Sequence, residues 1–340
     1  MLHCEQVLIS EHLFTGGTNI AVSQEQYRLL YRIAHAYYDE GLTQEQIARR
    51  FGLSRPKVSR LLQQARQEKV VSIVITPPPG DGAGLEHALE QRYGLEEAIV
   101  VTPNDATQIR ATIRELGPAA AECLLRSIPE KGIVGIAWGS TLLAVVDALP
   151  SRAMPDVTVV QVVGGLGPVD SREHSTELTR RVAHKLGAQF RLLPAPGVVS
   201  SRAAAEALRA DGQIAATLAL AAGADVAVVG LGAPSPGALL LRDGSIISAP
   251  EMQAIIAAGA VGDLALRYLK ADGQPLDLEI NDRIIGLTLE QLRRIPRVIG
   301  VAGGESKIAI LRAALRARLL HVLVTDQASA ARLLEEESDD

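Results

Sequence analysis

Apolar side chains recur every three or four residues over the first part of the chain, which is the spacing of one buried helix face. Such a series spans residues 27–38, and Gly41 follows it as a helix cap. Thr43 and Gln46 then have the spacing of a capping box, which begins a second, short helix. The pattern therefore predicts two helices separated by a tight turn.

The segment GLSRPKVSRLL, residues 52–62, predicts a third helix that follows a glycine turn. Ser54 is a good N-cap, and Pro56 falls in the first turn, where its missing N–H breaks no hydrogen bond. Val58 starts an apolar stripe that continues to Ala65, and the opposite face is polar and basic. A helix, a short helix, a glycine turn and a helix with a basic outer face together predict a helix-turn-helix module.

The polar face of this third helix is predicted to contact double-stranded DNA. In such modules the last helix lies in the major groove with its N-terminal residues against base edges, and Arg, Ser and Gln side chains bind bases or phosphates. A solvated helix with a charged face is the alternative, and it would be preferred for an isolated basic helix. The capped short helix and the Gly-Leu-Ser turn favour DNA binding instead. The residues predicted to bind DNA are Arg49, Arg50, Ser54, Arg55, Lys57, Ser59, Arg60, Gln63 and Arg66.

The charge distribution agrees with this interpretation. The whole chain has a net charge of −5, which by itself does not indicate a nucleic-acid partner. Residues 24–70 nevertheless contain nine Lys and Arg against five Asp and Glu, a net charge of +4, so the rest of the chain carries −9. A small basic module joined to a larger acidic one indicates a polyanion partner for the basic module.

Two further features follow the third helix. VVSIVITPP, residues 70–78, alternates weakly and is rich in β-branched residues, so it predicts a strand such as the wing of a winged-helix module. PPPGDGAG, residues 77–84, breaks the composition and predicts a linker. The predicted organisation is an N-terminal extension (1–22), a DNA-binding domain (23–76), the linker (77–84) and a larger C-terminal domain (85–340).

The chain beyond residue 85 alternates apolar strands with amphipathic helices, such as those over 107–127 and 306–318. Uninterrupted apolar strands separated by helices are typical of a parallel sheet that is covered on both faces. The predicted fold class is therefore α/β, with a doubly wound, mostly parallel sheet that binds ligands at the carboxyl ends of its strands. The predicted strands are 98–102, 133–138, 157–163, 226–231, 298–303 and 321–325.

Glycine-rich segments at the predicted strand ends contain the candidate binding residues. In WGST, residues 138–141, a strand leads into a helix, so that backbone N–H groups and two hydroxyls form an anion cradle; a hydrophilic turn is an equal alternative. In AGGESK, residues 302–307, Lys307 opposes the dipole of the next helix, which favours a negative ligand over a structural role. Asp263 follows a glycine and is either a helix cap or an acceptor for hydroxyl groups.

Several classes of protein and site are not expected. Cys4 and Cys123 lie far apart, which predicts no disulfide and fits a reducing cytosol. No apolar run approaches ~18 residues and the N-terminus has no signal-peptide pattern, so a cytoplasmic protein without a membrane partner is predicted. The glycine segments have neither Walker nor dinucleotide spacing, and the histidines form no metal pattern, so no cofactor is expected.

Several segments of the chain together resemble one family. They are GLTQEQIARRFGLSRPKVSRLLQQARQ, GIAWGST, GLGAP, GAVGDLALRY, INDRIIGL and VAGGESKIAILRAAL. In this order and spacing they resemble the SorC family of bacterial sugar-binding transcriptional regulators, a DeoR-type group, from about residue 24 to 335. The resemblance implies an effector domain similar to ribose-5-phosphate isomerases and glucosamine-6-phosphate deaminases. It also implies a homodimer or homotetramer that binds operator DNA and responds to phosphorylated sugars.

The resemblance further implies roles for individual residues. Gly139, Ser140 and Thr141 would hold a phosphate. Lys307 would contact the anionic or oxygenated end of the effector, and Asp263 would accept hydrogen bonds from sugar hydroxyls. Additional candidates that would line the cleft are Gly164, Gly165, Gly232 and Glu251.

The predicted function is a transcriptional repressor whose operator affinity is controlled by a phosphorylated sugar, and no enzymatic activity is predicted. One alternative is a sugar-phosphate isomerase or deaminase with a DNA-binding appendage, in which Asp263 and Lys307 act as acid and base. Another alternative is a scaffold whose glycine loops are only turns.

Overall fold

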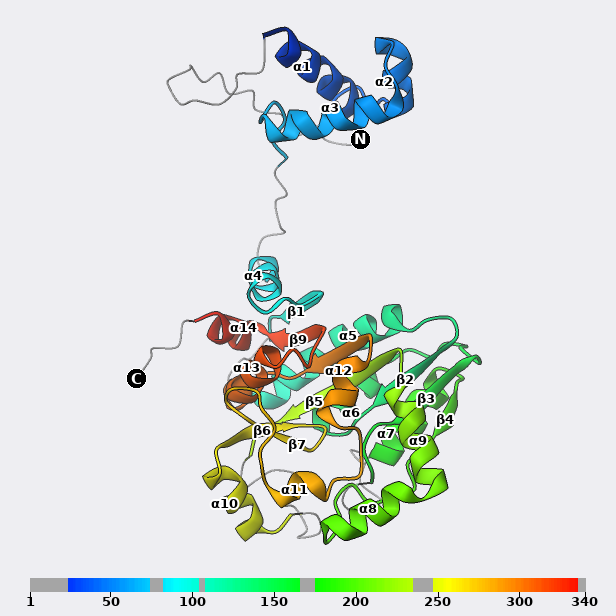
Figure 1. Cartoon of the computed structure of the whole chain (residues 1–340), viewed down its shortest axis with the longest axis vertical. Coiled ribbons are helices and arrows are strands. Elements are labelled where there is room, and N and C mark those ends of the chain that lie inside the picture. The colour runs from blue at the N-terminus through cyan, green and yellow to red at the C-terminus, as the bar shows by residue number, and fades with distance from the viewer. Residues whose placement is uncertain (1–23, 74–81, 104–107, 166–174, 235–246, 336–340) are drawn as a thin grey trace. The chain divides into compact units, whose positions relative to one another are not determined.

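The computed structural model describes residues 24–73, 82–103, 108–165, 175–234 and 247–335. The chain divides into two compact units, Met1–Thr76 and Pro77–Asp340, whose helices and strands are labelled in Figure 1. The extension predicted over residues 1–22 lies outside the described residues.

The first unit is the predicted three-helix module. Its second helix begins with the predicted capping box, because the Thr43 side chain accepts a hydrogen bond from Gln46 N–H and the Gln46 side chain accepts one from Thr43 N–H at 2.8 Å. This helix ends at Gly52, whose φ of 64° lies in the left-handed region that favours glycine. Ile47 and Val58 belong to the buried core of the module. The helices are α1 (Gln24–Tyr38), α2 (Gln44–Phe51) and α3 (Arg55–Gln67).

The strand predicted from residue 70 is not present in the described part of that segment, which ends at residue 73. The N–H of Val71 donates to the carbonyl of Ala65 at 3.2 Å, and Lys69 has a φ of 56°, so the chain turns directly after α3. Val70 and Val71 pack against a small core that contains Leu30. The predicted strand therefore does not begin at residues 70–73, where the β-branched side chains pack against the helical core. The remainder of the predicted strand lies outside the described residues.

The described residues of the second unit form a nine-stranded sheet. Seven strands are parallel neighbours in the order β1-β9-β8-β5-β2-β3-β4. All six strands predicted from apolar runs are confirmed, since buried strands of a covered parallel sheet need apolar side chains on both faces. They are β1 (Glu97–Val101), β2 (Gly132–Ile136), β3 (Val157–Gln161), β5 (Val226–Gly232), β8 (Arg297–Val301) and β9 (Val322–Asp326).

The sequence pattern does not predict the other three strands. β4 (Gln189–Arg191) is short, and all its side chains are exposed. β6 (Ala260–Leu264) and β7 (Arg267–Lys270) form an antiparallel pair that joins the end of β5, where Leu231 pairs with Leu264. Their burial results from contacts with distant segments, so no local periodicity marks them.

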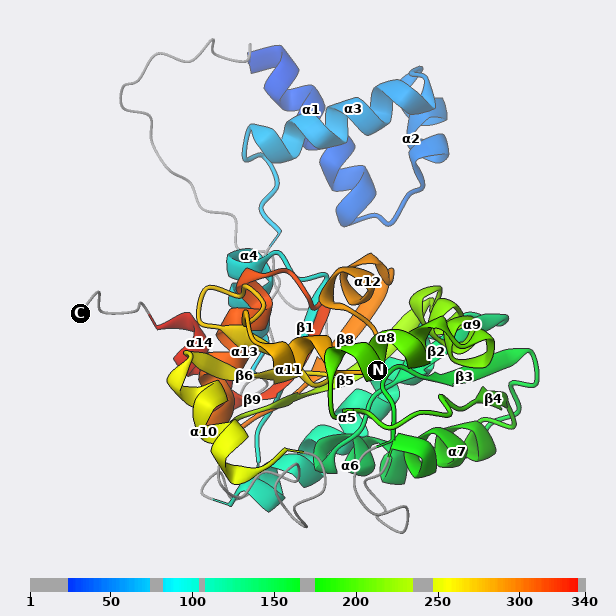
Figure 2. The same cartoon turned by 60° about the horizontal axis from the view of Figure 1, so that its bottom comes forward.

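Helices cover both faces of this sheet and confirm the doubly wound architecture (Figure 2). α5, α6 and α7 pack together on one face, and α9 and α12 pack on the other. The chain moves outward from β2 to β3 and β4, but returns from β5 to β8 and β9, so the neighbours β2 and β5 form a topological switch point.

The predicted helices over 107–127 and 306–318 correspond to α5 and to the 3₁₀ turn η1 followed by α13. Helix α4 begins at Ala83, inside the range predicted as a linker. The helices are α4 (Ala83–Tyr93), α5 (Ile109–Ser127), α6 (Ser140–Ala148), α7 (Ser175–Lys185), α8 (Arg202–Ala210), α9 (Gly212–Ala222), α10 (Ala249–Ala257), α11 (Glu279–Asp282), α12 (Leu289–Arg294), η1 (Glu305–Lys307), α13 (Ile308–Arg316) and α14 (Gln327–Leu334).

Candidate nucleic-acid surface and ligand pocket

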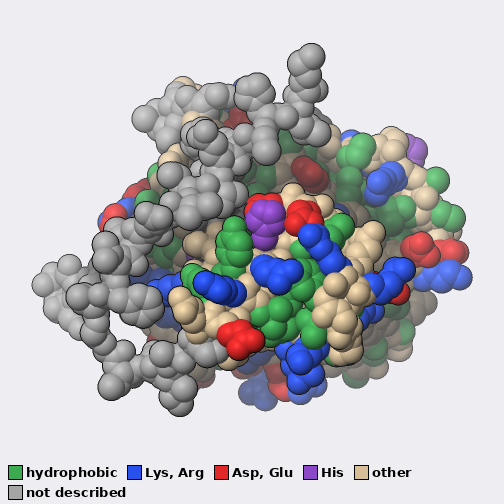
Figure 3. All heavy atoms as spheres, turned by 90° about the horizontal axis from the view of Figure 1, so that it is seen from above, with side chains coloured by type: hydrophobic (Ala, Val, Ile, Leu, Met, Phe, Trp, Pro, Cys, Tyr) green, Lys and Arg blue, Asp and Glu red, His purple; other side chains and the backbone are tan. Residues whose placement is uncertain are grey.

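The outward face of α3 carries most of the side chains predicted to bind DNA. Val58 and Leu62 are 0% and 3% exposed, so the apolar stripe is buried as expected. Figure 3 shows one face of this unit, on which several Lys and Arg side chains lie among hydrophobic and neutral polar ones, together with a His and a few Asp or Glu side chains. This arrangement leaves the cations accessible to a polyanion. The exposed candidates in and beside α3 are Ser54, Arg55, Lys57, Ser59, Arg60, Gln63 and Arg66.

The first turn of α3 keeps a hydroxyl available. Ser54 occupies the N-cap position with an extended backbone, but its side chain makes no capping hydrogen bond to the described helix. Pro56 lies in the first turn, as predicted, and its carbonyl accepts a hydrogen bond from the Arg60 Nε at 3.5 Å. The helix therefore begins where the sequence indicates, while the Ser54 hydroxyl is not used by the cap.

Arg49 and Arg50, at the end of α2, have different surroundings. Arg49 is exposed and lies 3.9 Å from Glu45. Arg50 forms an ion pair with Glu40 and lies over the Phe51 ring at 5.7 Å. The hydrogen bond from Arg50 lowers the pKa of Glu40 below its usual value. Arg50 thus ties α2 to the preceding turn, whereas Arg49 extends into solvent.

A pocket of about 400 Å³ opens at the carboxyl ends of β2, β5 and β8. It contains the switch point between β2 and β5, which is where doubly wound sheets bind ligands. Segments from six parts of the chain form its wall, around residues 111, 138, 232, 252, 265 and 306. The predicted effector-binding residues in this wall are Gly139, Ser140, Thr141, Gly232, Asp263 and Lys307.

The loop between β2 and α6 forms one side of the pocket. Gly139 has a φ of 119° and a ψ of 165°, a conformation that residues with a side chain rarely adopt. Ser140 and Thr141 begin α6, whose N-cap residue has no side chain to occupy the free N–H groups. The wall therefore presents backbone donors, two hydroxyls and the positive end of a helix dipole.

Asp263 lies in the pocket wall but is only 6% exposed. The pairing of β5 with β6 places it opposite Gly232, where an added Cβ would lie 2.0 Å from the Asp263 Oδ1. Its Oδ2 accepts a hydrogen bond from the Leu266 N–H at 3.0 Å. Burial raises the pKa of Asp263, and the positive charge of Lys307 opposes this rise. Glycine at position 232 is therefore required by the packing of the carboxyl group.

Lys307 enters the pocket from η1, after β8. Burial lowers the pKa of Lys307, and the negative charge of Asp263 opposes this fall. No carboxylate of the described residues lies within 4.0 Å of the Lys307 ammonium group. The pocket thus contains a buried acid, Asp263, and a partly buried base, Lys307, and no direct ion pair joins them.

The structure adds residues that the sequence analysis did not identify. Trp138, the only tryptophan of the chain, lines the pocket together with Met252. Tyr268 also lines it, and β6–β7 pairing places it opposite Asp263. The Tyr268 hydroxyl is buried without a hydrogen-bond partner in the described structure, and burial raises its pKa. Adjacency to Gly139 could have indicated Trp138, but only strand pairing reveals Tyr268.

Gly164, Gly165 and Glu251 do not line this pocket, which corrects the expectation that they line the cleft. An added Cβ at Gly164 would lie 2.6 Å from the Pro196 carbonyl, and Gly165 forms a β-bridge with Pro196, so both glycines allow two loops to approach closely. Glu251 completes the capping box of α10 and pairs with Arg283 at 2.7 Å. The hydrogen bond from Arg283 lowers the pKa of Glu251 to about 2.

Comparison with known families matches both units. The "Putative sugar-binding domain" family matches residues 78–335, and the Sigma-70 region 4 family matches residues 32–68. The full-length sorbitol operon regulator SorC from Klebsiella pneumoniae has a similar structure, with a TM-score of 0.69 and 28% identity over 92% of this chain and 100% of that chain. The chain belongs to the SorC family of sugar-binding transcriptional regulators.

Relatives of this SorC-family protein share nearly its whole length. The transcriptional regulator LsrR of Klebsiella pneumoniae is 33% identical over 97% of this chain and 98% of that protein. The deoxyribonucleoside regulator of Bacillus subtilis is 32% identical over 93% of this chain and 100% of that protein. These relatives are regulators, not enzymes, so the isomerase or deaminase alternative is set aside. The protein is a DNA-binding transcriptional regulator with a sugar-binding domain.

Within the described residues, no helix is long and apolar enough to span a membrane.

Proposed function

We propose that a phosphorylated sugar binds in the pocket and controls the affinity of this regulator for its operator. The phosphate binds at the first turn of α6, where Ser140 and Thr141 add hydroxyls to the free N–H groups. Lys307 binds the anionic or oxygenated end of the effector, and Asp263 accepts hydrogen bonds from its hydroxyl groups. The volume of about 400 Å³ falls within the range of ~300–1,000 Å³ that is usual for small-molecule sites.

The observation that carries this proposal is that the pocket wall holds the buried carboxyl group of Asp263 and the partly buried ammonium group of Lys307. A buried charge is costly unless it is paired or hydrogen-bonded. Burial shifts the pKa of each group toward its neutral form, and no direct ion pair between them compensates. A ligand with both hydroxyl groups and an anionic group supplies partners to both side chains at once, which an apolar ligand cannot do.

The DNA-binding part of the proposal assigns the outward face of α3 to an operator. Arg49 and Arg66 contact backbone phosphates, which gives an attraction that weakens with salt. A homodimer or homotetramer presents two such helices to two half-sites. The protein represses transcription while it is bound to the operator. An effector relieves this repression by favouring the arrangement of the oligomer that binds DNA less well. The residues assigned to base edges are Arg55, Lys57, Ser59 and Arg60.

Fluorescence of Trp138 tests the effector site directly, because it is the only tryptophan and lies in the pocket wall. Sorbitol 6-phosphate and 2-deoxyribose 5-phosphate are suitable probes, since two relatives are named for sorbitol and deoxyribonucleosides. We expect at least one of them to change the emission, and its unphosphorylated form to bind at least ~10-fold more weakly because it lacks the charge-assisted hydrogen bonds. Equal binding of both forms would reject the phosphate assignment.

Lys307→Met adds a test of the cationic end of the site. We expect it to weaken binding of the sugar phosphate by about 1–3 kcal/mol, the value of a hydrogen bond to a charged group. Lys131→Met is the control, because Lys131 is 81% exposed and lies outside the pocket. Equal affinities of the two variants would contradict the role of Lys307.

A further inference from the structure

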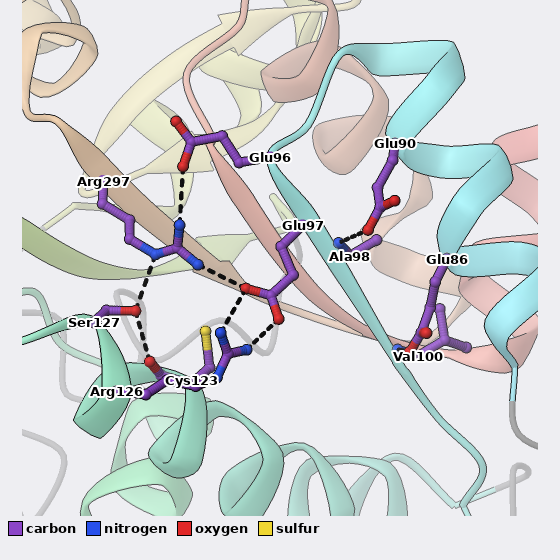
Figure 4. Close-up of polar contacts among 10 residues, drawn as sticks. All are labelled: Glu86, Glu90, Glu96, Glu97, Ala98, Val100, Cys123, Arg126, Ser127 and Arg297. Carbon is purple, nitrogen blue, oxygen red and sulfur yellow. Dashed lines mark hydrogen bonds and ion pairs between the residues drawn. The ribbon is translucent and has the colours of Figure 1, made fainter. Parts of the chain in front are cut away.

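Helix α4 is the first described element of the second unit, and it does not line the pocket. It packs on the edge strand β1 and on the C-terminal helix α14. Figure 4 shows two of its carboxylates reaching the strand backbone. Glu86 accepts a hydrogen bond from the Val100 N–H at 2.8 Å, and Glu90 accepts one from the Ala98 N–H at 3.0 Å. These bonds satisfy donors on the side of β1 that no strand covers.

Helix α14 also packs against α4. The Tyr93 hydroxyl donates to the Leu333 carbonyl at 2.8 Å, and Arg92 donates to the Leu334 carbonyl at 2.6 Å. Leu89 and Leu333 are both 0% exposed and belong to the same apolar core. A displacement of α14 therefore changes the surface on which α4 rests.

Asp326 joins α14 to the pocket. Its Oδ1 accepts the Ser329 N–H at 3.0 Å, which caps α14. Its Oδ2 accepts the Gly304 N–H at 2.8 Å and the Ser329 hydroxyl at 2.6 Å. Gly304 begins the short loop that carries Ser306 and Lys307 into the pocket wall. A single carboxylate, 2% exposed, thus restrains both the pocket loop and the helix that holds α4.

We propose that Asp326 is the positioning residue through which the pocket loop acts on α4, and thereby on the chain that leads to the DNA-binding unit. The connection runs from the Lys307 loop through Asp326 and α14 to α4. A ligand that binds Lys307 restrains Gly304, and Asp326 transmits this restraint because its two oxygens bond to both elements. The inference rests on the proposed function, since it assigns a regulatory path to the same pocket.

Asp326→Asn is expected to keep the hydrogen bond that caps α14 and to break the hydrogen bond to the pocket loop. Asn remains a good N-cap, and its amide oxygen can still accept the Ser329 N–H. Its NH₂ group then faces the Gly304 N–H, and two donors cannot bond to each other. Asp211→Asn is the matched control, because Asp211 caps α9 in the same way and does not line the pocket.

Hydrogen exchange of the full chain without ligand gives the first readout. In Asp326→Asn we expect the α4 amides, residues 83–93, to exchange about tenfold faster than in the wild type, as for loss of one hydrogen bond to a charged group. Asp211→Asn leaves α4 unchanged, and α7 is unchanged in both variants. Unchanged exchange at α4 in Asp326→Asn overturns the inference. If that variant does not fold, Ser329→Ala, which removes the hydroxyl shared by Asp326 and Gly304, is expected to show the same effect, and its failure to do so also overturns the inference.

The second readout adds sorbitol 6-phosphate or 2-deoxyribose 5-phosphate. In the wild type we expect slower exchange at residues 139–141 and also at α4, and in Asp326→Asn slower exchange at 139–141 only. Slowing at α4 that persists in Asp326→Asn overturns the inference and leaves the proposed function intact. If neither probe slows exchange at 139–141 in the wild type, the proposed function fails, and the comparison without ligand still decides the role of Asp326.

Discussion

The α3 face and the pocket place their charged side chains in opposite environments. The cations on α3 are solvated, so they cost little to maintain and attract a polyanion from a distance in a salt-dependent manner. Asp263 is buried and Lys307 is partly buried, so charging either group is costly until a partner reaches it. The α3 face therefore suits a long charged polymer, whereas the pocket suits a small ligand with complementary groups.

Among the substitutions that test the pocket, Gly232→Ala is expected to have the greatest effect on stability. Gly232→Ala places a Cβ 2.0 Å from the Asp263 Oδ1, so the β5–β6 pairing or the carboxyl group must move. We expect the free energy of unfolding to fall by about 3 kcal/mol, the upper range for overpacking. Thermal or denaturant unfolding measures this change. Gly230→Ala is the control, because the nearest atom to its added Cβ is 3.6 Å away; equal stability of the two variants would contradict the packing argument.

The next effect concerns the exposed region. Arg60→Ala is expected to weaken binding to an operator selected from random duplexes by about 1–3 kcal/mol and to relax the sequence preference at one position. Its unfolding temperature should not change, because the side chain is exposed. Gel-shift titration checks the affinity. Arg49→Ala should instead weaken binding to all sequences alike and reduce the salt slope by about 1. A retained sequence preference in Arg60→Ala would contradict the assignment of α3.

Asp263→Asn tests the cost of the buried charge, because the carboxyl group of Asp263 is expected to reduce the stability of the fold. Burial raises its folded-state pKa, so the native protein binds more protons than the unfolded chain above pH 3.8. The free energy of unfolding of the wild type therefore decreases as the pH rises through the folded-state pKa of Asp263. The variant has no carboxyl group at this position and does not show this decrease. We expect the variant to be about 1 kcal/mol more stable at neutral pH, equally stable well below pH 3.8, and weaker in effector binding. Calorimetry at several pH values tests this, and a destabilised variant at neutral pH would contradict it.

The smallest effect is expected at Glu251, outside the pocket. The pKa of Glu251 is lowered to about 2, so its ion pair with Arg283 stabilises the fold above the usual pKa and is lost as pH falls toward 2. Because the side chain is 39% exposed, Glu251→Gln should cost only about 0.5 kcal/mol at neutral pH. Sugar-phosphate affinity, measured by Trp138 fluorescence, should not change. A loss of affinity as large as that of Lys307→Met would show that Glu251 contributes to the effector site.

Local signals in the sequence predict the parts of the molecule that depend on local physics. The capping box at Thr43, the glycine turn at Gly52 and the apolar strands need only neighbouring residues to be recognised, and the structure confirms them. Exposure of Arg60 likewise follows from helical periodicity. By contrast, no local pattern indicates Tyr268, because only the pairing of β6 with β7 brings it opposite Asp263.

Two errors in the sequence analysis have the same origin. Val70 and Val71 are β-branched residues typical of a strand, but in the structure they pack against the helical core that contains Leu30. Gly164 has the appearance of a ligand-binding glycine, but its small size allows another loop to approach its backbone. In both cases the residue type was recognised, and its tertiary partner decided its role.

The central claim, that a ligand in the pocket alters DNA binding, is tested most directly by operator affinity with and without a sugar phosphate. Gel-shift titrations with the probe that changes Trp138 fluorescence should show operator binding weakened about 5–150-fold, the range for a coupling of ~1–3 kcal/mol. Lys307→Met should show little change at the same probe concentration. An operator affinity that stays constant while Trp138 reports a saturated wild-type pocket would contradict the account.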